Sequence, residues 1–226
     1  MTTGFFGHIG RNCWFVLALL LFSCKKYNSC NDLMGACAGN PEGRYCTFGF
    51  KWGGDNLFAD AGVEQAGPGT SGGIITFGYF DPGHLVNTHS QTDVSTLSFS
   101  QVTACEAQEQ IERALKAWSS VADFEFELVP VEKASIKFAV ADIEQGGVAF
   151  PCFTDDLCSA IAGLVVLDIP SRSTCEGFYN MVLHEIGHAL GLGHVDSHNI
   201  MNPSKSTLTE LGSGDIDGMQ SIYGKK

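Results

Sequence analysis

Apolar and polar residues alternate in several short segments of the second half of the chain. Alternation with β-branched and aromatic residues, stopped by Pro or Gly, predicts half-buried strands. On this basis we expect strands at residues 74–80, 124–129, 135–140 and 148–150. Residues 164–168 are apolar on both faces, which predicts a fully buried strand. Residues 84–102 carry only scattered apolar positions, and we expect a loop there.

Helical periodicity marks three further segments. Ile111, Ala114, Leu115 and Trp118 recur at helical spacing, which predicts an amphipathic helix over residues 104–120. Residues 103–106 have the form of a capping box at its start. We expect two more helices, at about residues 175–190 and 213–223. The apolar face of the first of these two is made of Phe178, Val182, Ile186 and Ala189.

Three histidines and one glutamate form the most specific motif of the chain. His184 and His188 are four residues apart, so on a helix they lie one turn apart, about 6 Å along the axis. Glu185 can reach a metal-bound water without being a ligand. Gly191 can end the helix in the left-handed conformation, which lets the chain return His194 to the same ion. Three protein ligands leave one position open for water, as in a catalytic zinc site.

The length of the motif separates it from a chance match. His-Glu-x-x-His alone arises by chance in many helices, whereas Gly191 and His194 at their offsets are far more demanding. With these residues the sequence resembles the metzincin metalloproteases. Downstream, residues 199–203 resemble the Met-turn of that group, with Met201 under the zinc site, although an ordinary apolar turn is the alternative.

Two other segments narrow the resemblance to the matrixins, the family of the matrix metalloproteinases. Residues 111–126 are similar to their first helix and second strand, and residues 215–224 to their closing helix. The resemblance implies a matrixin-like zinc protease domain at residues 73–226, with an α+β fold: a twisted mixed five-stranded sheet and three helices. It also implies that the edge segment Gly147-Val148-Ala149-Phe150 pairs with an extended substrate.

The chain also departs from the matrixin pattern. Matrix metalloproteinases carry further histidines that hold a structural zinc, but no histidine lies between His89 and His184, so we expect one catalytic zinc and no second one. Lys205 stands where an aromatic residue is expected after the Met-turn, so the cleavage preference is not carried over. Calcium sites stay open, because acidic surface loops are usually just solvated; the acidic residues concerned are Asp142, Asp155, Asp156 and Asp168.

The function that follows is zinc-dependent endopeptidase activity. His184, His188 and His194 would hold the ion, which lowers the pKa of its bound water to about 7. Glu185 would take the water proton as general base and deliver it to the leaving amine. Two alternatives belong to other classes: a catalytically silent, zinc-containing surface lipoprotein, or an adhesion module in residues 25–70.

The N-terminus has the features of an export signal. Arg11 precedes an apolar stretch at residues 14–22 that is short for a membrane span, so we expect residues 1–23 to be a cleaved signal peptide. Residues 21–24 resemble a bacterial lipobox, which makes Cys24 a lipidation candidate. The protein would then be an anchored lipoprotein at the cell surface or in the periplasm. A plain secretory signal, giving a secreted protein, is the alternative.

Residues 24–72 form a cysteine-containing segment followed by a Gly-rich linker. The cysteines fit an oxidising compartment, and we expect a local disulfide between Cys152 and Cys158. The odd count left after Cys13 and Cys24 predicts one free thiol, unless Cys24 is itself paired. Cys37 resembles the latency cysteine by which matrixin propeptides cap the zinc. Its alternative is a disulfide with Cys30 or Cys46, which are both nearby in the sequence.

The net charge limits the partners. The formal charge is −12, with no Lys/Arg-rich run, which argues against a nucleic acid or an anionic lipid surface. We therefore expect protein or peptide substrates, contact with a membrane only through a lipid anchor, and a monomer. His84, His89 and His198 lie outside the motif, and histidines in such positions are usually on the surface or in turns.

Overall fold

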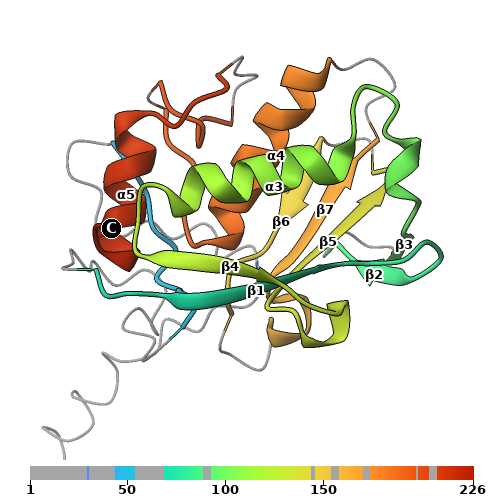
Figure 1. The fold of residues 1–226 in the computed structure, drawn as a ribbon, viewed down its shortest axis with the longest axis horizontal. Helices are drawn as coiled ribbons and strands as arrows, with labels where there is room; N and C mark the ends of the chain where they lie inside the picture. Colours follow the sequence, from blue (N-terminus) through green and yellow to red (C-terminus); the bar gives the residue numbers. More distant parts are fainter. Residues whose placement is uncertain are drawn as a thin grey trace, which may run out of the picture.

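The five strands expected from the sequence form one mixed sheet (Figure 1). The computed structural model describes residues 30, 44–53, 69–88, 93–143, 146–153, 158–169, 174–196, 198–203 and 208–226. The sheet order is β4-β1-β5-β7-β6. The first four of these pair in parallel, and β6 pairs antiparallel with β7 at one edge. Their bounds are β1 Gly73–Tyr79, β4 Phe124–Leu128, β5 Ile136–Ala141, β6 Gly147–Ala149 and β7 Leu164–Asp168.

Three α-helices accompany this sheet in the described part of the chain. They are α3 (Ala107–Ser119), α4 (Cys175–Ala189) and α5 (Ser213–Tyr223), close to the bounds expected from periodicity. Figure 1 shows α3 and α4 on the same side of the sheet. The α+β fold with a mixed five-stranded sheet and three helices is therefore confirmed.

Both faces of the sheet are buried at its centre. Along β5, Phe138 and Val140 pack into a core with residues of all three helices, whereas Ala139 and Ala141 pack into a second core on the opposite face. The second core also contains Phe48 and Phe50 from the segment before the linker, together with Cys30, Val86, Phe153 and Cys158. Residues far upstream of residue 73 thus contribute to the core, while the expected domain boundary there stays a prediction.

Two local expectations were wrong. A two-stranded hairpin, β2 (Leu85–Asn87) and β3 (Asp93–Ser95), occupies part of the expected loop. Its strands have three residues each and only Val86 is fully buried, so they carry almost no alternation signal. Helix α3 begins at Ala107 and not at residue 104, because residues 103–105 form a turn and a bend. Glu106 is the N-cap residue, without a side-chain capping bond, so the capping box is absent.

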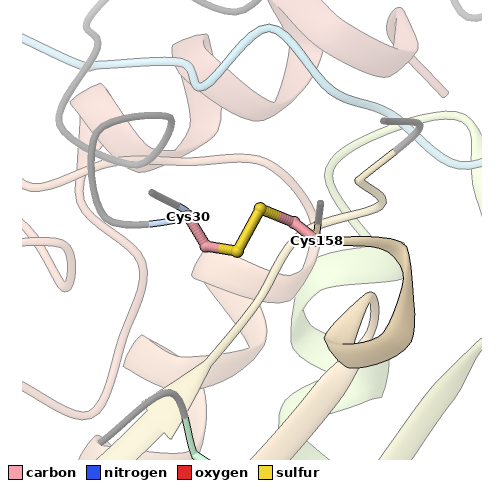
Figure 2. The surroundings of a disulfide bond; sticks show 2 residues. All are labelled: Cys30 and Cys158. Atoms are coloured by element: carbon pink, nitrogen blue, oxygen red, sulfur yellow. A yellow bond between two sulfur atoms is a disulfide. The ribbon is translucent and has the colours of Figure 1, made fainter. Parts of the chain in front are cut away.

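The expected disulfide was also wrong. Cys158 is bonded to Cys30, with a Cα–Cα distance of 5.7 Å, and Cys152 is a free thiol (Figure 2). Cys158 and Cys30 are both buried in the second core. Cys158 therefore pairs with a cysteine that is distant in the sequence and not with one from its own loop. The expectation of one free thiol fails as well: Cys105 and Cys175 are free besides Cys152.

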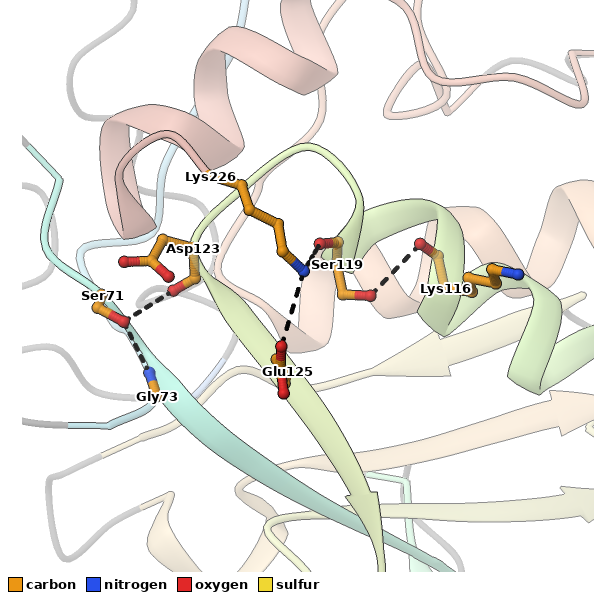
Figure 3. A network of polar contacts seen from close by, with 7 residues as sticks. All are labelled: Ser71, Gly73, Lys116, Ser119, Asp123, Glu125 and Lys226. Atoms are coloured by element: carbon orange, nitrogen blue, oxygen red, sulfur yellow. Dashed lines mark hydrogen bonds and ion pairs between the residues drawn. The ribbon is translucent and has the colours of Figure 1, made fainter.

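The C-terminal residue ties the end of the chain to α3 and β4 (Figure 3). The ammonium of Lys226 donates to the carbonyl of Ser119 at 3.1 Å and lies 4.0 Å from the carboxylate of Glu125. Next to it, the Ser71 hydroxyl donates to the carbonyl of Asp123 at the start of β4. Both contacts are exposed, so each contributes little to the stability of the fold.

Several expectations fall on residues outside the described ones. These are the signal peptide, Cys24, Cys37, most of the linker, His89, Asp155, Asp156 and Lys205. Across the described residues, no helix has both the length and the apolar character needed to cross a membrane.

Candidate active site

The structure brings the three histidines of the motif together. Nε2 of His194 lies 3.1 Å from Nε2 of His184 and 3.0 Å from Nε2 of His188. Zinc binds imidazole nitrogen at about 2.0–2.1 Å, so tetrahedral ligands lie about 3.3 Å apart. The observed spacing therefore fits one ion held by the three Nε2 atoms, and these residues form the one group of this kind in the described part of the chain.

Backbone carbonyls fix the orientation of two of these rings. Nδ1 of His184 lies 2.7 Å from the carbonyl of Ile200, and Nδ1 of His188 lies 2.7 Å from that of Leu192. A carbonyl only accepts, so each Nδ1 carries the proton and each Nε2 keeps its lone pair free for a metal. Burial lowers the pKa of both rings, and for His188 the neighbouring histidines lower it further. Neutral imidazoles are the form that binds zinc.

Local sequence explains how the ligands reach one point. The hydroxyl of Thr174 accepts a hydrogen bond from the Gly177 N–H and opens α4, which carries His184 and His188. The chain leaves the helix at Gly191, whose φ of +110° lies in the region that favours glycine. This turn returns His194, which is exposed, to the two ligands on the helix.

Glu185 lies beside this group in an apolar setting. Its side chain is 6% exposed, and burial raises its pKa to about 8. A divalent cation bound at the histidines would lower this pKa, because opposite charge favours the ionised form. A Cβ on Gly147 would lie 2.7 Å from a carboxylate oxygen of Glu185. The absence of a side chain at Gly147 therefore lets the edge strand β6 approach the carboxylate.

Met201 packs directly under α4. A Cβ on Gly187 would lie 2.3 Å from the Met201 sulfur, so a side chain at this point of the helix would force the Met201 side chain to move. Of the four residues in the expected substrate strand, Gly147 and Val148 are half-buried, while Ala149 and Phe150 are buried. Phe150 also donates its N–H to the carbonyl of Leu164. The first half of this segment is therefore its more exposed part.

Sequence patterns did not point to two further residues at this site. The carboxylate of Asp215, on α5, accepts hydrogen bonds from the N–H groups of Ile200 and Met201, at 2.7 and 3.2 Å. The ring of Phe48 stacks on His188, with centroids 5.7 Å apart. Asp215 lies in a segment similar to the matrixin closing helix, which gave a weak signal. Phe48 belongs to a short aromatic segment, residues 48–52, whose sequence gives no sign of a metal site.

Several known proteins are similar in sequence to the part of the chain that carries this site. The model of the Matrixin family matches residues 170–224, which contain α4, the turn after it and α5. Over these residues the chain is similar to the matrixins. Interstitial collagenase of Oryctolagus cuniculus is 31% identical over 140 residues, covering 54% of this chain and 29% of that protein. Stromelysin-1 of Rattus norvegicus is 30% identical over 132 residues, covering 50% of this chain and 28% of that protein.

A plant protein shows the same degree of similarity. Metalloendoproteinase 1 of Glycine max is 32% identical over 135 residues, covering 50% of this chain and 44% of that protein. The chain therefore spans less than half the length of each of these relatives. Together with the three-histidine group, the similarity to the matrixins supports zinc as the metal.

Proposed function

We propose that this matrixin-like domain is a zinc-dependent endopeptidase that hydrolyses peptide bonds in extended protein substrates. The observation that carries the proposal is the convergence of three imidazole Nε2 atoms beside the buried carboxyl of Glu185. Three neutral ligands leave an open position, which is the arrangement of catalytic rather than structural zinc.

The histidines and Glu185 have different roles in this proposal. His184, His188 and His194 hold the metal, which when bound supplies an acidified water and polarises the substrate carbonyl. Glu185 accepts the proton of the attacking water and returns it to the leaving amine. Burial of Glu185 raises its pKa and so favours proton uptake, while a divalent cation at the histidines would favour the ionised carboxylate that accepts the proton.

The unpaired edge of β6 supports binding of an extended substrate. β6 is the last strand of the described sheet, and it lies against α4 through the contact of Gly147 with Glu185. A peptide added along this edge gains main-chain hydrogen bonds, which suits a substrate of loose sequence preference.

N-methylation of the substrate tests the strand. We expect a cleavable peptide with an N-methyl group on one amide that pairs with β6 to be cut about fivefold more slowly, since a lost hydrogen bond costs about 1 kcal/mol. The matched peptide is methylated at the neighbouring amide, which points away from β6. Equal slowing by the two methyl groups would contradict pairing along this edge.

Metal removal tests the proposed function against its alternative, a silent zinc-containing lipoprotein. We expect a chelator to abolish casein cleavage, and stoichiometric Zn²⁺ to restore it, since the histidines alone offer no activated water. The measurements are cleavage of casein and metal content. A protein that holds one zinc but cleaves neither casein nor a mixed peptide library would favour the silent lipoprotein.

Export is supported by the cystine of the second core. A disulfide between Cys30 and Cys158 forms in an oxidising compartment and is rare in the cytosol. We infer that the protein is exported after cleavage of residues 1–23, with lipidation of Cys24 as its anchor. Mass spectrometry of the mature N-terminus distinguishes the anchored form from a secreted one.

A further inference from the structure

Residues 44–53, here called the strap, precede the linker but lie against the end of α4 and the turn after it, and residues 46–51 of the strap are buried. Cys46, Thr47, Phe48 and Phe50 are each 1–3% exposed. In Figure 1 the strap is the blue segment that runs beside α5. Arg44 at its start forms an ion pair with Asp217 on that helix. A segment of this kind is part of the folded domain and not a tether.

The strap hydrogen-bonds to the end of α4 and to the turn that follows. The last carbonyls of a helix lack partners inside the helix and need donors from elsewhere. The indole N–H of Trp52 donates to the carbonyl of Ala189 at 2.7 Å. Thr47 and Leu192 form an antiparallel bridge between the two segments. On either side of the bridge, Phe48 N–H donates to the carbonyl of Gly191 at 2.9 Å, and Gly193 N–H to that of Cys46 at 2.8 Å.

These contacts reach both ends of the turn between two metal ligands. The turn follows the end of α4 at Ala189, one residue after His188, and leads to His194. The ring of Phe48 lies nearly parallel to that of His188, at an interplanar angle of 27°. A Cβ on Gly193, the residue before His194, would lie 2.7 Å from the Cys46 sulfur and 2.9 Å from the Phe48 ring. The strap and the turn are therefore packed with no room for a side chain between them.

We propose that the strap is a positioning element of the metal centre: Phe48 sets the ring plane of His188, and the paired backbone sets the turn that carries His194. The proposal rests on the proposed function only in that the metal is zinc. Residues that orient metal ligands change metal affinity about 10- to 100-fold when they are replaced. The strap acts through these ligands and does not touch substrate.

One consequence concerns processing of the N-terminal segment. If proteolysis ends a latency role of Cys37, the cut has to fall before residue 44, because loss of the strap removes the partners of the turn. The segment before such a cut would stay attached through the disulfide between Cys30 and Cys158. A cleavage that takes residues 25–70 would abolish metal binding as well as any latency, so it does not report on Cys37.

The test compares Phe48→Leu with Phe138→Leu. Both rings are buried, at 2% and 0% exposure, but Phe138 lies on β5 and its ring contacts those of Phe77 and Tyr79, whereas Phe48 contacts His188. We expect Phe48→Leu to raise the zinc Kd about 10- to 100-fold, measured by competition with a chromogenic chelator, and to alter the visible spectrum of the Co²⁺-substituted protein. Phe138→Leu should lower the unfolding midpoint and leave both metal readouts unchanged.

The outcomes separate this proposal from the proposed function. Unchanged zinc Kd and Co²⁺ spectrum in folded Phe48→Leu would overturn the positioning role, whether or not the wild type cleaves peptides. A wild type that binds zinc but cleaves nothing would overturn the proposed function and leave the strap comparison valid. If Phe48→Leu does not fold, Trp52→Phe removes the donor to Ala189 and keeps a ring; a raised zinc Kd then supports the proposal and an unchanged one overturns it.

Discussion

We expect Glu185→Gln to lower kcat/KM for casein about 10³-fold while zinc stays bound, because general acid–base catalysis contributes about 10²- to 10⁴-fold. Glutamine keeps the shape of the side chain but cannot accept a proton at neutral pH. Glu185 does not take part in the three-nitrogen cluster, so its replacement leaves the ligands in place. The measurements are casein cleavage and zinc content of the purified variant.

The control for this variant is Glu176→Gln on the same helix. Glu176 is exposed in the first turn of α4, so its replacement changes the same charge without touching the site. We expect it to retain wild-type cleavage and to lose at most about 1 kcal/mol of stability through the helix dipole. Full turnover by Glu185→Gln, or an equal loss in both variants, would show that Glu185 is not the base.

Short-range periodicity was sufficient for most of the fold. Helix α4 was predictable because its buried side chains repeat with the helical period, as for Phe178, Val182 and Ile186. Strands β5 and β7 were predictable as short apolar segments, and both are buried along almost their whole length. The hairpin β2–β3 was missed because a three-residue strand with one buried side chain has no period to detect. The cystine was missed because its two cysteines are 128 residues apart, and sequence spacing holds no information about their Cβ distance.

The residues of the candidate site also fall into those that the sequence predicts and those that it does not. The histidines could be predicted because a helix and one glycine turn fix their relative positions over eleven residues. Phe48 and Asp215 could not, because each reaches the site from a distant segment through tertiary packing. The local motif thus depends on contacts with two distant segments. The strap binds the turn that leads to His194, and the buried carboxylate of Asp215 binds the Met-turn.

The hydrogen bonds between Asp215 and the Met-turn predict a large loss of stability in Asp215→Asn. Asp215 is 1% exposed, and its two oxygens accept from the N–H groups of Ile200, Met201 and Gly212. Burial raises its pKa, while these three backbone donors act in the opposite direction. Asparagine places an NH₂ group where an acceptor is needed, so at least one buried N–H loses its partner.

We expect this variant to lose about 3 kcal/mol, since a buried unsatisfied donor costs about 1–3 kcal/mol and hydrogen bonds to a charged group are the stronger kind. The unfolding midpoint should fall by about 6–12 °C. The zinc Kd should also rise, because the carbonyl of Ile200, which fixes the ring of His184, belongs to the same turn. Calorimetry and chelator competition measure the two effects.

Asp217→Asn is the matched control, because it makes the same change two residues further along α5. Asp217 is 43% exposed and pairs with Arg44 in solvent, where an ion pair contributes about 0–1 kcal/mol. We expect its midpoint to stay within about 4 °C of the wild type and its zinc affinity to be unchanged. If the two variants lose equal stability, the Met-turn is held by packing of Met201 under α4 and not by the carboxylate. If only Asp215→Asn weakens zinc, the carboxylate on α5 is part of what keeps His184 aimed at the metal.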